Sequence, residues 1–377
     1  MKKVAIIGAG ISGLYFANLL QKNQKYNFKI FEAKKNFELS SGYGIQLSVN
    51  SIKLLNEIGF QNIEAQEVYF PKRVNFYDAK FLKKICDIDI SKFNYENNRY
   101  TTLKRSTLQK FLLKNIPKEK IFHDCELKKI DYNDKLILTF SNSFKDEFDY
   151  LLVADGVFSK SKSIIFKKKI FPKYFDSIAL RGNIKSLECS DISIYLGSNF
   201  HFVVYPLNQN NEYNFISVIR KNLKKEEAID KNYFKNNELL KSLVNEISSK
   251  TSFDFKYKLE NLKCFPIFIS KKFDKPKIKN LFFAGDALYS IPPSFAQGAA
   301  QSIEASKEVY EEIENHTNNY YQKRYKKIKS VNSRSMLNHF AFHLSNPLTI
   351  FIRNFFLKFL TKNKRFLEYY LGKIYKN

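Results

Sequence analysis

Three glycines and one acidic residue near the start of the chain have the spacing of a nucleotide-binding loop. Gly8, Gly10 and Gly13 form a Gly-x-Gly-x-x-Gly pattern, and Glu32 follows Gly13 by 19 residues. In such a loop the first glycine allows a tight turn, the second admits a pyrophosphate to a helix N-terminus, and the third lets helix and strand pack. The acidic residue would accept hydrogen bonds from the adenosine ribose hydroxyls. This pattern leaves open whether the nucleotide is NAD or FAD.

The elements that must position this loop are indicated on both sides of it. The apolar residues 4–7 predict a short strand, residues 14–22 predict a helix, and residues 28–31 predict a second strand that ends at Glu32. Strand, turn, helix and strand in this order are the context that the glycine pattern requires.

A second segment with the same chemistry lies late in the chain. An apolar run at 280–284 predicts a buried parallel strand that ends at Gly285 and Asp286. A loop with two prolines follows, and Gln297 and Gly298 open a predicted helix. Glycines at such a strand end and helix start let the backbone approach a polar ligand. We therefore predict that two distant segments serve one large nucleotide cofactor.

Two shorter segments lie between them. Arg105 precedes an amphipathic helix, and Asp155 and Gly156 end an apolar strand at 150–154. Arg105 is either an exposed charge at a helix start or a clamp on a cofactor phosphate or ring system. A glycine after an aspartate at a strand end is by itself an ordinary turn. The order of the four motifs along the chain is more specific than any one of them.

In this order the motifs resemble those of the single-component (group A) FAD-dependent aromatic monooxygenases, most closely the salicylate and 3-hydroxybenzoate hydroxylase branch. The resemblance covers nearly the whole chain. It implies an α/β fold with a discontinuous Rossmann-like FAD-binding domain of the glutathione-reductase type, an inserted antiparallel β-sheet substrate domain and a C-terminal helical tail. We predict the FAD-binding domain at 1–70, 100–170 and 275–325, the substrate domain at 71–99 and 171–274, and the helical segment at 326–377.

The resemblance also implies an activity and a set of cofactor contacts. The protein would use NADH or NADPH and dioxygen to hydroxylate a phenolic substrate through a flavin hydroperoxide. The loop 42–47 matches the family's glycine loop near the isoalloxazine, with Gly42 and Gly44 in it and Asn50 in the helix that follows. The residues expected at FAD are Gly8, Gly10, Ile11, Ser12, Gly13, Glu32, Ala33, Gly44, Arg105, Asp155, Gly156, Gly285, Asp286, Pro293, Gln297, Gly298 and Ala299.

The residues between the Asp155-Gly156 and Gly285-Asp286 motifs should determine substrate specificity. Residues 192–207 and 213–220 alternate as antiparallel strands would, around a turn at 208–211. His201 and Tyr205 are four residues apart, so both face the same side of a strand. The resemblance implies that His201, which precedes a Tyr-Pro pair, is the base for the substrate phenol. The alternative is a lone histidine on a half-exposed sheet face. We predict His201, Tyr205 and Gln297 as the catalytic residues.

The chain departs from the family's pattern in three places. Leu288 and Tyr289 follow Gly-Asp-Ala where a histidine is usual, Lys162 stands where arginine is frequent, and Ala305 stands where aspartate is frequent. The substrate and the choice between NADH and NADPH therefore stay open.

The composition is that of a globular protein with a large positive charge, and its widely spaced cysteines fit a reducing cytoplasm, where we expect the protein. The net charge is +26, but lysine far outnumbers arginine and no nucleic-acid recognition motif accompanies it, so we expect no nucleic-acid partner. The four cysteines and five histidines have no metal-ligand spacing, so no metal site is predicted. The apolar run at 4–7 is too short for a signal peptide or a spanning helix.

The tail from residue 320 onwards is predicted to be helical, and residues 348–360 are broadly apolar. This stretch would pack on the body or form a homodimer interface. The alternative is a peripheral contact of 348–371 with the inner face of a membrane. That contact would favour a lipid-soluble substrate, and the protein would then be a polyprenyl-phenol hydroxylase of a quinone pathway or a polyprenyl reductase. A flavin-binding protein without hydroxylase activity is the third class left open.

Overall fold

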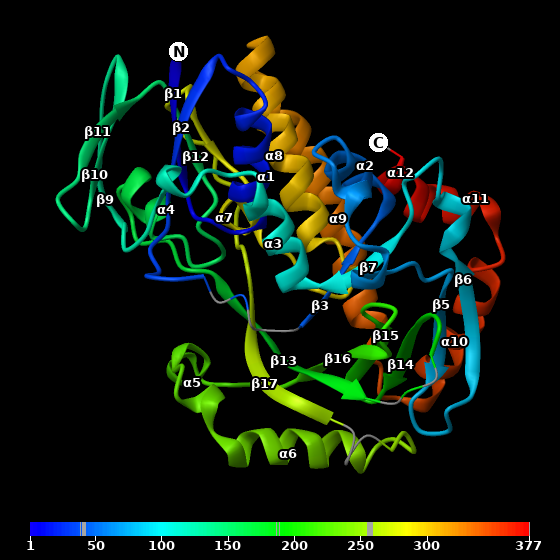
Figure 1. Cartoon of the computed structure of the whole chain (residues 1–377). Coiled ribbons are helices and arrows are strands. Elements are labelled where there is room, and N and C mark those ends of the chain that lie inside the picture. The colour runs from blue at the N-terminus through cyan, green and yellow to red at the C-terminus, as the bar shows by residue number, and fades with distance from the viewer. Residues whose placement is uncertain (38, 40–42, 186, 188, 255–258, 377) are drawn as a thin grey trace.

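The computed structural model of the chain describes residues 1–37, 39, 43–185, 187, 189–254 and 259–376 (Figure 1). Gly42, which we expected near the isoalloxazine, lies outside these described residues. Two larger sheets, two smaller sheets and a set of C-terminal helices make up the architecture.

The first larger sheet is parallel and contains the segments that carry the nucleotide-binding motifs. Its five strands lie in the order β18-β12-β1-β2-β8, and every described pair of neighbours is parallel. Helices α1 and α8 pack against each other beside it. The Rossmann-like expectation is confirmed. The bounds are β1 Lys2–Ile7, α1 Ile11–Gln21, β2 Tyr26–Phe31, β8 Ile121–Phe122, β12 Tyr150–Val153, α4 Lys160–Ile165, β18 Leu281–Phe283, α7 Gly285–Tyr289 and α8 Gly298–Asn315.

The second larger sheet has seven strands in the order β17-β13-β16-β15-β14-β5-β6. We expected it to be antiparallel, and its described pairs are, except that β14 runs parallel to β5. This exception arises because β5 comes from a segment distant in sequence, so no hairpin dictates its direction. The bounds are β5 Arg73–Asp78, β6 Lys84–Asp89, β13 Lys173–Lys185, β14 Ile192–Gly197, β15 Phe200–Pro206, β16 Glu212–Arg220 and β17 Leu259–Ile269.

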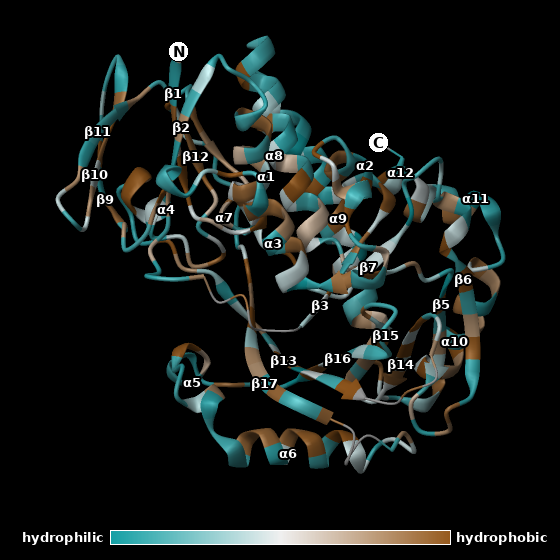
Figure 2. Ribbon diagram, in the orientation of Figure 1, coloured by the Kyte–Doolittle hydropathy of each residue, from teal (hydrophilic) through white to brown (hydrophobic). Residues whose placement is uncertain are grey.

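One face of this sheet is covered by the amphipathic helix α6 (Asn237–Ser248). Leu239, Leu243 and Ile247 are buried against the phenylalanines of β15 and β16. Apolar and polar residues accordingly alternate along α6, as brown and teal in Figure 2. The other face of the sheet is left to line the site. The short helix α5 (Lys225–Ile229) precedes α6.

The segment 192–207 is a hairpin and not one strand. Its two strands, β14 and β15, pair antiparallel and are joined at Asn199, whose φ is +64°. Asparagine tolerates this left-handed conformation better than most residues, so the turn forms where alternation alone did not indicate it.

Two three-stranded sheets complete the β structure, in the orders β11-β10-β9 and β3-β7-β4. Helices α2 and α3 accompany the second of them. The bounds are β3 Gly44–Leu47, α2 Val49–Asn56, β4 Val68–Tyr69, β7 Thr101–Lys104, α3 Arg105–Lys114, β9 Leu127–Asn133, β10 Lys135–Phe140 and β11 Lys145–Phe148.

The C-terminal tail is helical, as expected, and its end belongs to the body of the protein. Ile374 and Tyr375 are buried, and the ring of Tyr375 contacts Phe93 and Tyr100. Among the described residues no helix has the length and apolar character needed to cross a membrane. The domain boundaries given above stay a prediction. The tail contains α9 Tyr320–Phe342, α10 Pro347–Leu360, α11 Lys364–Leu367 and α12 Lys373–Tyr375.

Candidate active site

A cavity of about 1010 Å³ lies between the two larger sheets. On one side it is lined by the loops that follow β1, β12 and β18, at the carboxyl ends of the parallel strands. On the other side it is lined by the face of β13, β14, β15 and β16 that α6 leaves uncovered. Ligands of open parallel sheets bind at these carboxyl ends. The arrangement therefore brings a nucleotide-type site and a mostly apolar sheet face into one space.

The glycine loop after β1 is shaped for a close approach. Gly8 has a φ of +99°, and a Cβ there would lie 2.5 Å from the Ala154 carbonyl oxygen, while a Cβ on Gly13 would lie 2.0 Å from the Gly8 oxygen. Gly10 differs, because no described atom outside its own stretch of chain lies within 4 Å of the position its Cβ would take, and Gly10 lines the cavity. The space beside the N-terminus of α1 is thus open to a phosphate, which the helix dipole and free N–H groups favour.

Glu32 holds this loop in place. Its Oε2 accepts a hydrogen bond from the Ala9 N–H at 2.9 Å, and its Oε1 accepts one from the Lys34 N–H at 3.0 Å. Neither Glu32 nor Ala33 lines the cavity. Their contact with a ribose stays a prediction.

The segment after β18 places a carboxylate and a cation at the same cavity. Gly285 has a φ of +59°, and the Asp286 side chain that follows lines the cavity together with Arg105, at the start of α3. Burial raises the pKa of Asp286 above its usual value, and the nearby Arg105 guanidinium opposes that shift. A carboxylate and a guanidinium at this edge can bind hydroxyl and phosphate groups of a nucleotide.

A second helix N-terminus faces the cavity at α8. Pro293, Gly298 and Ala299 line it, and no described atom outside its own stretch of chain lies within 4 Å of a Cβ built on Gly298. Two helix starts with open glycines therefore border one space, which suits a ligand with more than one anionic or polar group.

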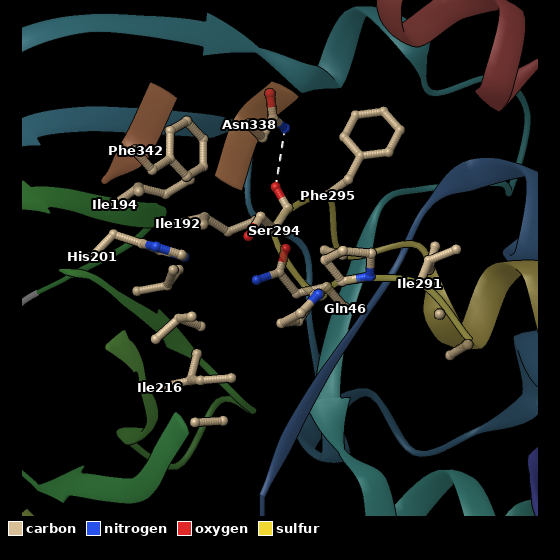
Figure 3. A pocket seen from close by; sticks show the side chains of 18 of the residues that line it. Gln46, Ile192, Ile194, His201, Ile216, Ile291, Ser294, Phe295, Asn338 and Phe342 are labelled. Atoms are coloured by element: carbon tan, nitrogen blue, oxygen red, sulfur yellow. Dashed lines mark hydrogen bonds between the residues drawn. The ribbon is translucent and has the colours of Figure 1, made fainter. Parts of the chain in front are cut away.

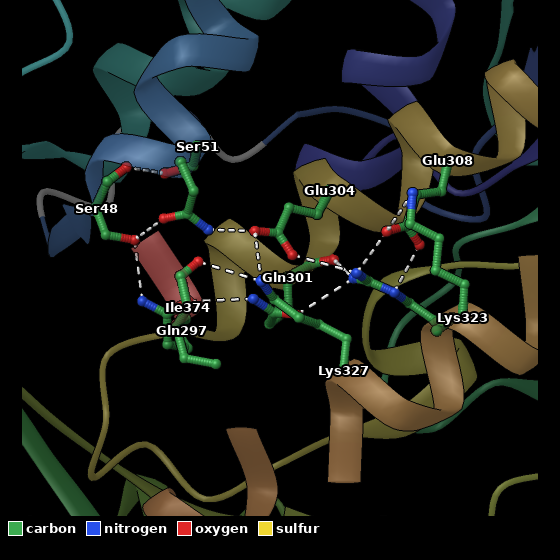
Figure 4. Close-up of polar contacts among 11 residues, drawn as sticks. Ser48, Ser51, Gln297, Gln301, Glu304, Glu308, Lys323, Lys327 and Ile374 are labelled. Atoms are coloured by element: carbon green, nitrogen blue, oxygen red, sulfur yellow. Dashed lines mark hydrogen bonds and ion pairs between the residues drawn. The ribbon is translucent and has the colours of Figure 1, made fainter. Parts of the chain in front are cut away.

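The side chain of Gln297 turns away from the cavity. Its amide Nε2 donates to Ser48 Oγ at 2.9 Å, and its Oε1 accepts from Gln301 Nε2 at 3.1 Å (Figure 4). Gln297 is buried and does not line the cavity. Its polar groups are committed to α2 and α8, so the catalytic role that we predicted for it has no contact to support it.

The buried network around Gln297 ties α8 to α2 and α9 (Figure 4). Asn50 of α2 donates to Glu304, and Arg324 of α9 pairs with Glu304 and Glu308 at 3.2 and 2.9 Å. The Arg324 side chain is only 1% exposed. Because buried charges need such partners, this network fixes where the N-terminus of α8 lies.

Asp155 also stabilises the structure around the cavity and does not face into it. Its Oδ2 accepts from the Ser161 N–H at 3.3 Å, at the start of α4, and the residue does not line the cavity, whereas Gly156 does. Lys162, one of the departures from the family's pattern, is buried and donates to the Leu288 carbonyl at 3.2 Å while pairing with Asp274 at 3.4 Å. These contacts join α4 to the end of α7.

His201 lies on β15 in the sheet face opposite the nucleotide-type loops (Figure 3). It is buried, lines the cavity, and its Nδ1 lies 3.1 Å from Nε2 of His343. Burial lowers the pKa of His201 well below its usual value, and His343 and His339 add to this effect. The imidazole is therefore neutral at neutral pH.

The contacts of His343 are compatible with two tautomers of His201. Nδ1 of His343 lies 2.8 Å from the His339 carbonyl oxygen and its Nε2 lies 3.1 Å from the Val218 carbonyl oxygen, and both oxygens can only accept, so the single proton of the neutral ring can be on either nitrogen. Burial lowers the pKa of His343 to about 4, although the Val218 carbonyl near its Nε2 opposes the shift. When the proton is on Nδ1 of His343, its Nε2 accepts from Nδ1–H of His201, and Nε2 of His201 keeps the lone pair that a base needs; when it is on Nε2 of His343, that nitrogen donates to the Val218 carbonyl or to His201.

Tyr205 lies on the same side of β15 and lines the cavity with His201, as their spacing predicts. Burial raises the pKa of its phenol, and Arg181 and Gln46 oppose this. Gln46 also accepts a hydrogen bond from the Tyr100 hydroxyl at 2.9 Å. Gln46, Tyr100 and Tyr205 therefore form a cluster of polar side chains at this end of the cavity.

Comparison with known proteins connects this geometry with a group of enzymes. The family described as NAD(P)-binding Rossmann-like domain matches residues 6–37. The 6-hydroxynicotinate 3-monooxygenase of Pseudomonas fluorescens is 24% identical over 183 residues, which are 48% of this chain and 46% of the relative. Monooxygenase penA of Penicillium thymicola is 26% identical over 175 residues, 43% of this chain and 40% of the relative. The chain thus matches about half the length of these curated relatives.

The solved structures match nearly end to end. Klebsiella pneumoniae HpxO complexed with FAD and uric acid superposes with a TM-score of 0.83 at 16% identity, covering 99% of this chain and 96% of that one. A salicylate hydroxylase substrate complex superposes with a TM-score of 0.76 at 16% identity, covering 100% and 97%. The fold is that of the FAD-dependent aromatic hydroxylases. The resemblance inferred from the four motifs is confirmed at this level.

Arg181 is the site residue of this hydroxylase fold that sequence reasoning missed. It lies on β13, lines the cavity beside Tyr205 and Tyr43, and its guanidinium makes no hydrogen bond or ion pair with any described residue. Burial lowers its pKa, Tyr205 raises it and Arg105 lowers it further. The signal in the sequence was a lone arginine inside the apolar strand 178–184.

The cavity brings together most of the predicted residues, though their roles stay a prediction. Those that line it are Gly10, Ile11, Ser12, Gly44, Arg105, Gly156, His201, Tyr205, Gly285, Asp286, Pro293, Gly298 and Ala299. Those that support it from outside the lining are Gly8, Gly13, Glu32, Ala33, Asp155 and Gln297.

Proposed function

We propose that the protein is an FAD-dependent monooxygenase that uses NADH or NADPH and dioxygen to hydroxylate a phenolic or related aromatic substrate. One observation carries this proposal. The two open helix starts with Asp286 and Arg105 face, across a single cavity, a buried neutral histidine on an apolar sheet. The names of the relatives support it, since they include a 6-hydroxynicotinate 3-monooxygenase and a protein bound to FAD and uric acid.

The residues of the first side would hold the cofactor. The helix starts at Gly10 and Gly298 would bind the pyrophosphate, while Asp286 would accept from ribityl hydroxyls and Arg105 would lie against a phosphate or the ring. When bound, FAD supplies the electron transfer from the nicotinamide to dioxygen.

The second side would hold and activate the substrate. His201 Nε2 would accept the phenol proton, because a deprotonated ring is a better nucleophile. Apolar side chains such as Ile194, Ile216 and Phe342 would exclude water from the reacting centre (Figure 3).

Arg181 would pair with an anionic group of the substrate. We expect Arg181→Gln to raise KM for phenols with a carboxylate by about 10- to 100-fold, since a hydrogen bond to a charged group contributes about 1.5–3 kcal/mol. KM for neutral phenols should change little. Steady-state kinetics with matched acid and amide substrates measures this, and Arg99→Gln, at an exposed arginine outside the cavity, is the control. Equal changes for both substrates would remove this role.

The direct test of the function is substrate-stimulated oxidation of NADH and NADPH by the FAD-loaded protein across a panel of phenols. Hydroxylated product and hydrogen peroxide would be measured separately. We expect at least one phenol to stimulate oxidation and to appear as product. A protein that binds no FAD would contradict the whole proposal.

Several finer points stay predictions. A homodimer, a contact of 348–371 with a membrane, and the cytoplasmic location belong to this group. The polyprenyl-phenol hydroxylase and polyprenyl reductase alternatives receive no support from the comparisons.

A further inference from the structure

Helix α10 presents a row of large apolar side chains to solvent. We define the α10 face by residues spaced three and four apart, which share one side of a helix. Exposure along it ranges from 43% to 70%. A soluble monomer seldom exposes so continuous an apolar surface. Its members are Leu348, Phe351, Ile352, Phe355, Phe356 and Phe359.

The opposite side of α10 is the one that binds the protein, and it includes a charged residue. Arg353 is buried and donates to the Ala341 carbonyl at 3.3 Å. Leu357 packs against the cluster that contains Phe76 and Phe342. The helix is therefore anchored with an arginine inward and phenylalanines outward. That is the reverse of the usual orientation of an amphipathic surface helix, so the α10 face calls for a partner.

The α10 face borders the entrance of the cavity. Ile352 and Phe356 belong to it and also line the cavity, as do the exposed Leu337 and Phe340 at the end of α9. The same cavity contains His201. The cavity thus reaches from His201 to the α10 face, which gives a molecule at this surface a path to the site.

The charge around this surface decides between a lipid surface and a second copy of the chain. Residues 346–367 contain five Lys and Arg, of which all but the buried Arg353 are exposed, and no Asp or Glu. Lys358 flanks the α10 face, and Lys362, Lys364 and Arg365 are exposed just after it. A two-fold dimer through this face would oppose these cations with the same cations. Anionic lipid headgroups would neutralise them while the phenylalanines enter the acyl boundary.

We propose that the α10 face docks on the surface of an anionic lipid bilayer and that substrate enters from the lipid between α9 and α10. The helix lies in the interface and does not span the bilayer. The substrate would be an aromatic compound with an apolar, lipid-soluble part. This statement about the substrate rests on the proposed hydroxylation, whereas the docking does not.

The test is co-sedimentation of the whole 377-residue chain, loaded with FAD, with vesicles of phosphatidylglycerol and phosphatidylcholine, or of phosphatidylcholine alone. A triple variant, Phe351→Ser, Phe355→Ser and Phe359→Ser, alters the α10 face without touching residues that line the cavity. We expect salt-sensitive binding to the anionic vesicles only, reduced about 100-fold or more in the variant because three large apolar groups are lost. Flavin content and the unfolding midpoint should stay unchanged.

Two further variants test whether binding depends on the α10 face itself and on the cations beside it. Phe81→Ser, Tyr132→Ser and Phe158→Ser remove exposed aromatic groups elsewhere and should leave binding intact. Lys358→Glu with Lys362→Glu should weaken binding to anionic vesicles. The proposal is overturned if the wild type does not bind anionic vesicles, or if the triple variant binds them as strongly as the wild type does. It is also overturned if the α10 face instead forms a dimer that the triple variant dissociates. Binding without any hydroxylation would sustain the docking and remove the substrate statement.

Discussion

Gly10→Leu should yield a folded protein that no longer binds FAD. The backbone of Gly10 has φ −80° and ψ −175°, which any residue adopts. The Cβ of the new side chain would meet no described atom outside its own stretch of chain within 4 Å, and the leucine would occupy the space beside the N-terminus of α1. Flavin absorbance of the purified protein, after reconstitution with excess FAD, measures the effect, and we expect essentially complete loss.

Two controls distinguish a loss of FAD binding from a loss of the fold. Lys35→Leu places the same side chain on an exposed position of a neighbouring loop that does not line the cavity, and it should retain full flavin. Circular dichroism and cooperative urea unfolding should match the wild type in both variants. Stoichiometric FAD in Gly10→Leu would show that the cofactor does not lie at this loop.

His201→Gln should uncouple nicotinamide oxidation from hydroxylation, while oxidation itself continues. Flavin reduction by the nicotinamide needs no base on β15, whereas activation of the phenol does, so hydroxylated product should fall by about 100-fold or more. Hydrogen peroxide should rise in compensation, and FAD content should not change. The measurement is product and peroxide formed per NAD(P)H consumed.

His343 offers a graded comparison, because it contacts His201 and does not line the cavity. As a positioning residue it contacts Nδ1 of His201 and holds that ring in place, so His343→Leu should lower product less than His201→Gln and should shift the pH profile of product formation. His123→Gln, at a histidine outside the cavity, is the control. If flavin reduction and product formation fall in parallel in His201→Gln, the histidine is not the base.

The parts of the fold that local patterns determine could be predicted. The loop at Gly8 lies between the predicted strand and helix because its glycines satisfy close backbone contacts within a short stretch of chain. His201 and Tyr205 share a face because a strand has a period of two. The strand ends at Asp155 and Asp286 adjoin because their strands are neighbours in a parallel sheet.

The directions of individual polar side chains could not be predicted, because distant partners set them. Gln297 turns to Ser48, which lies 249 positions away. Asp155 faces the start of α4. The place of Arg181 at the cavity depends instead on which strands β13 pairs with, and these are distant in sequence. The outward orientation of α10 depends on Arg353 and the cluster at Phe342, which the apolar pattern of the helix does not reveal.

The most direct test of the central claim is the origin of the oxygen in the product. The FAD-loaded protein would be supplied with NADH or NADPH, isotopically labelled dioxygen and the phenol that most stimulates oxidation, and the product would be weighed by mass spectrometry. We predict one labelled oxygen atom in each hydroxylated molecule. Nicotinamide oxidation that ends in hydrogen peroxide for every phenol, or product whose oxygen comes from water, would contradict this account.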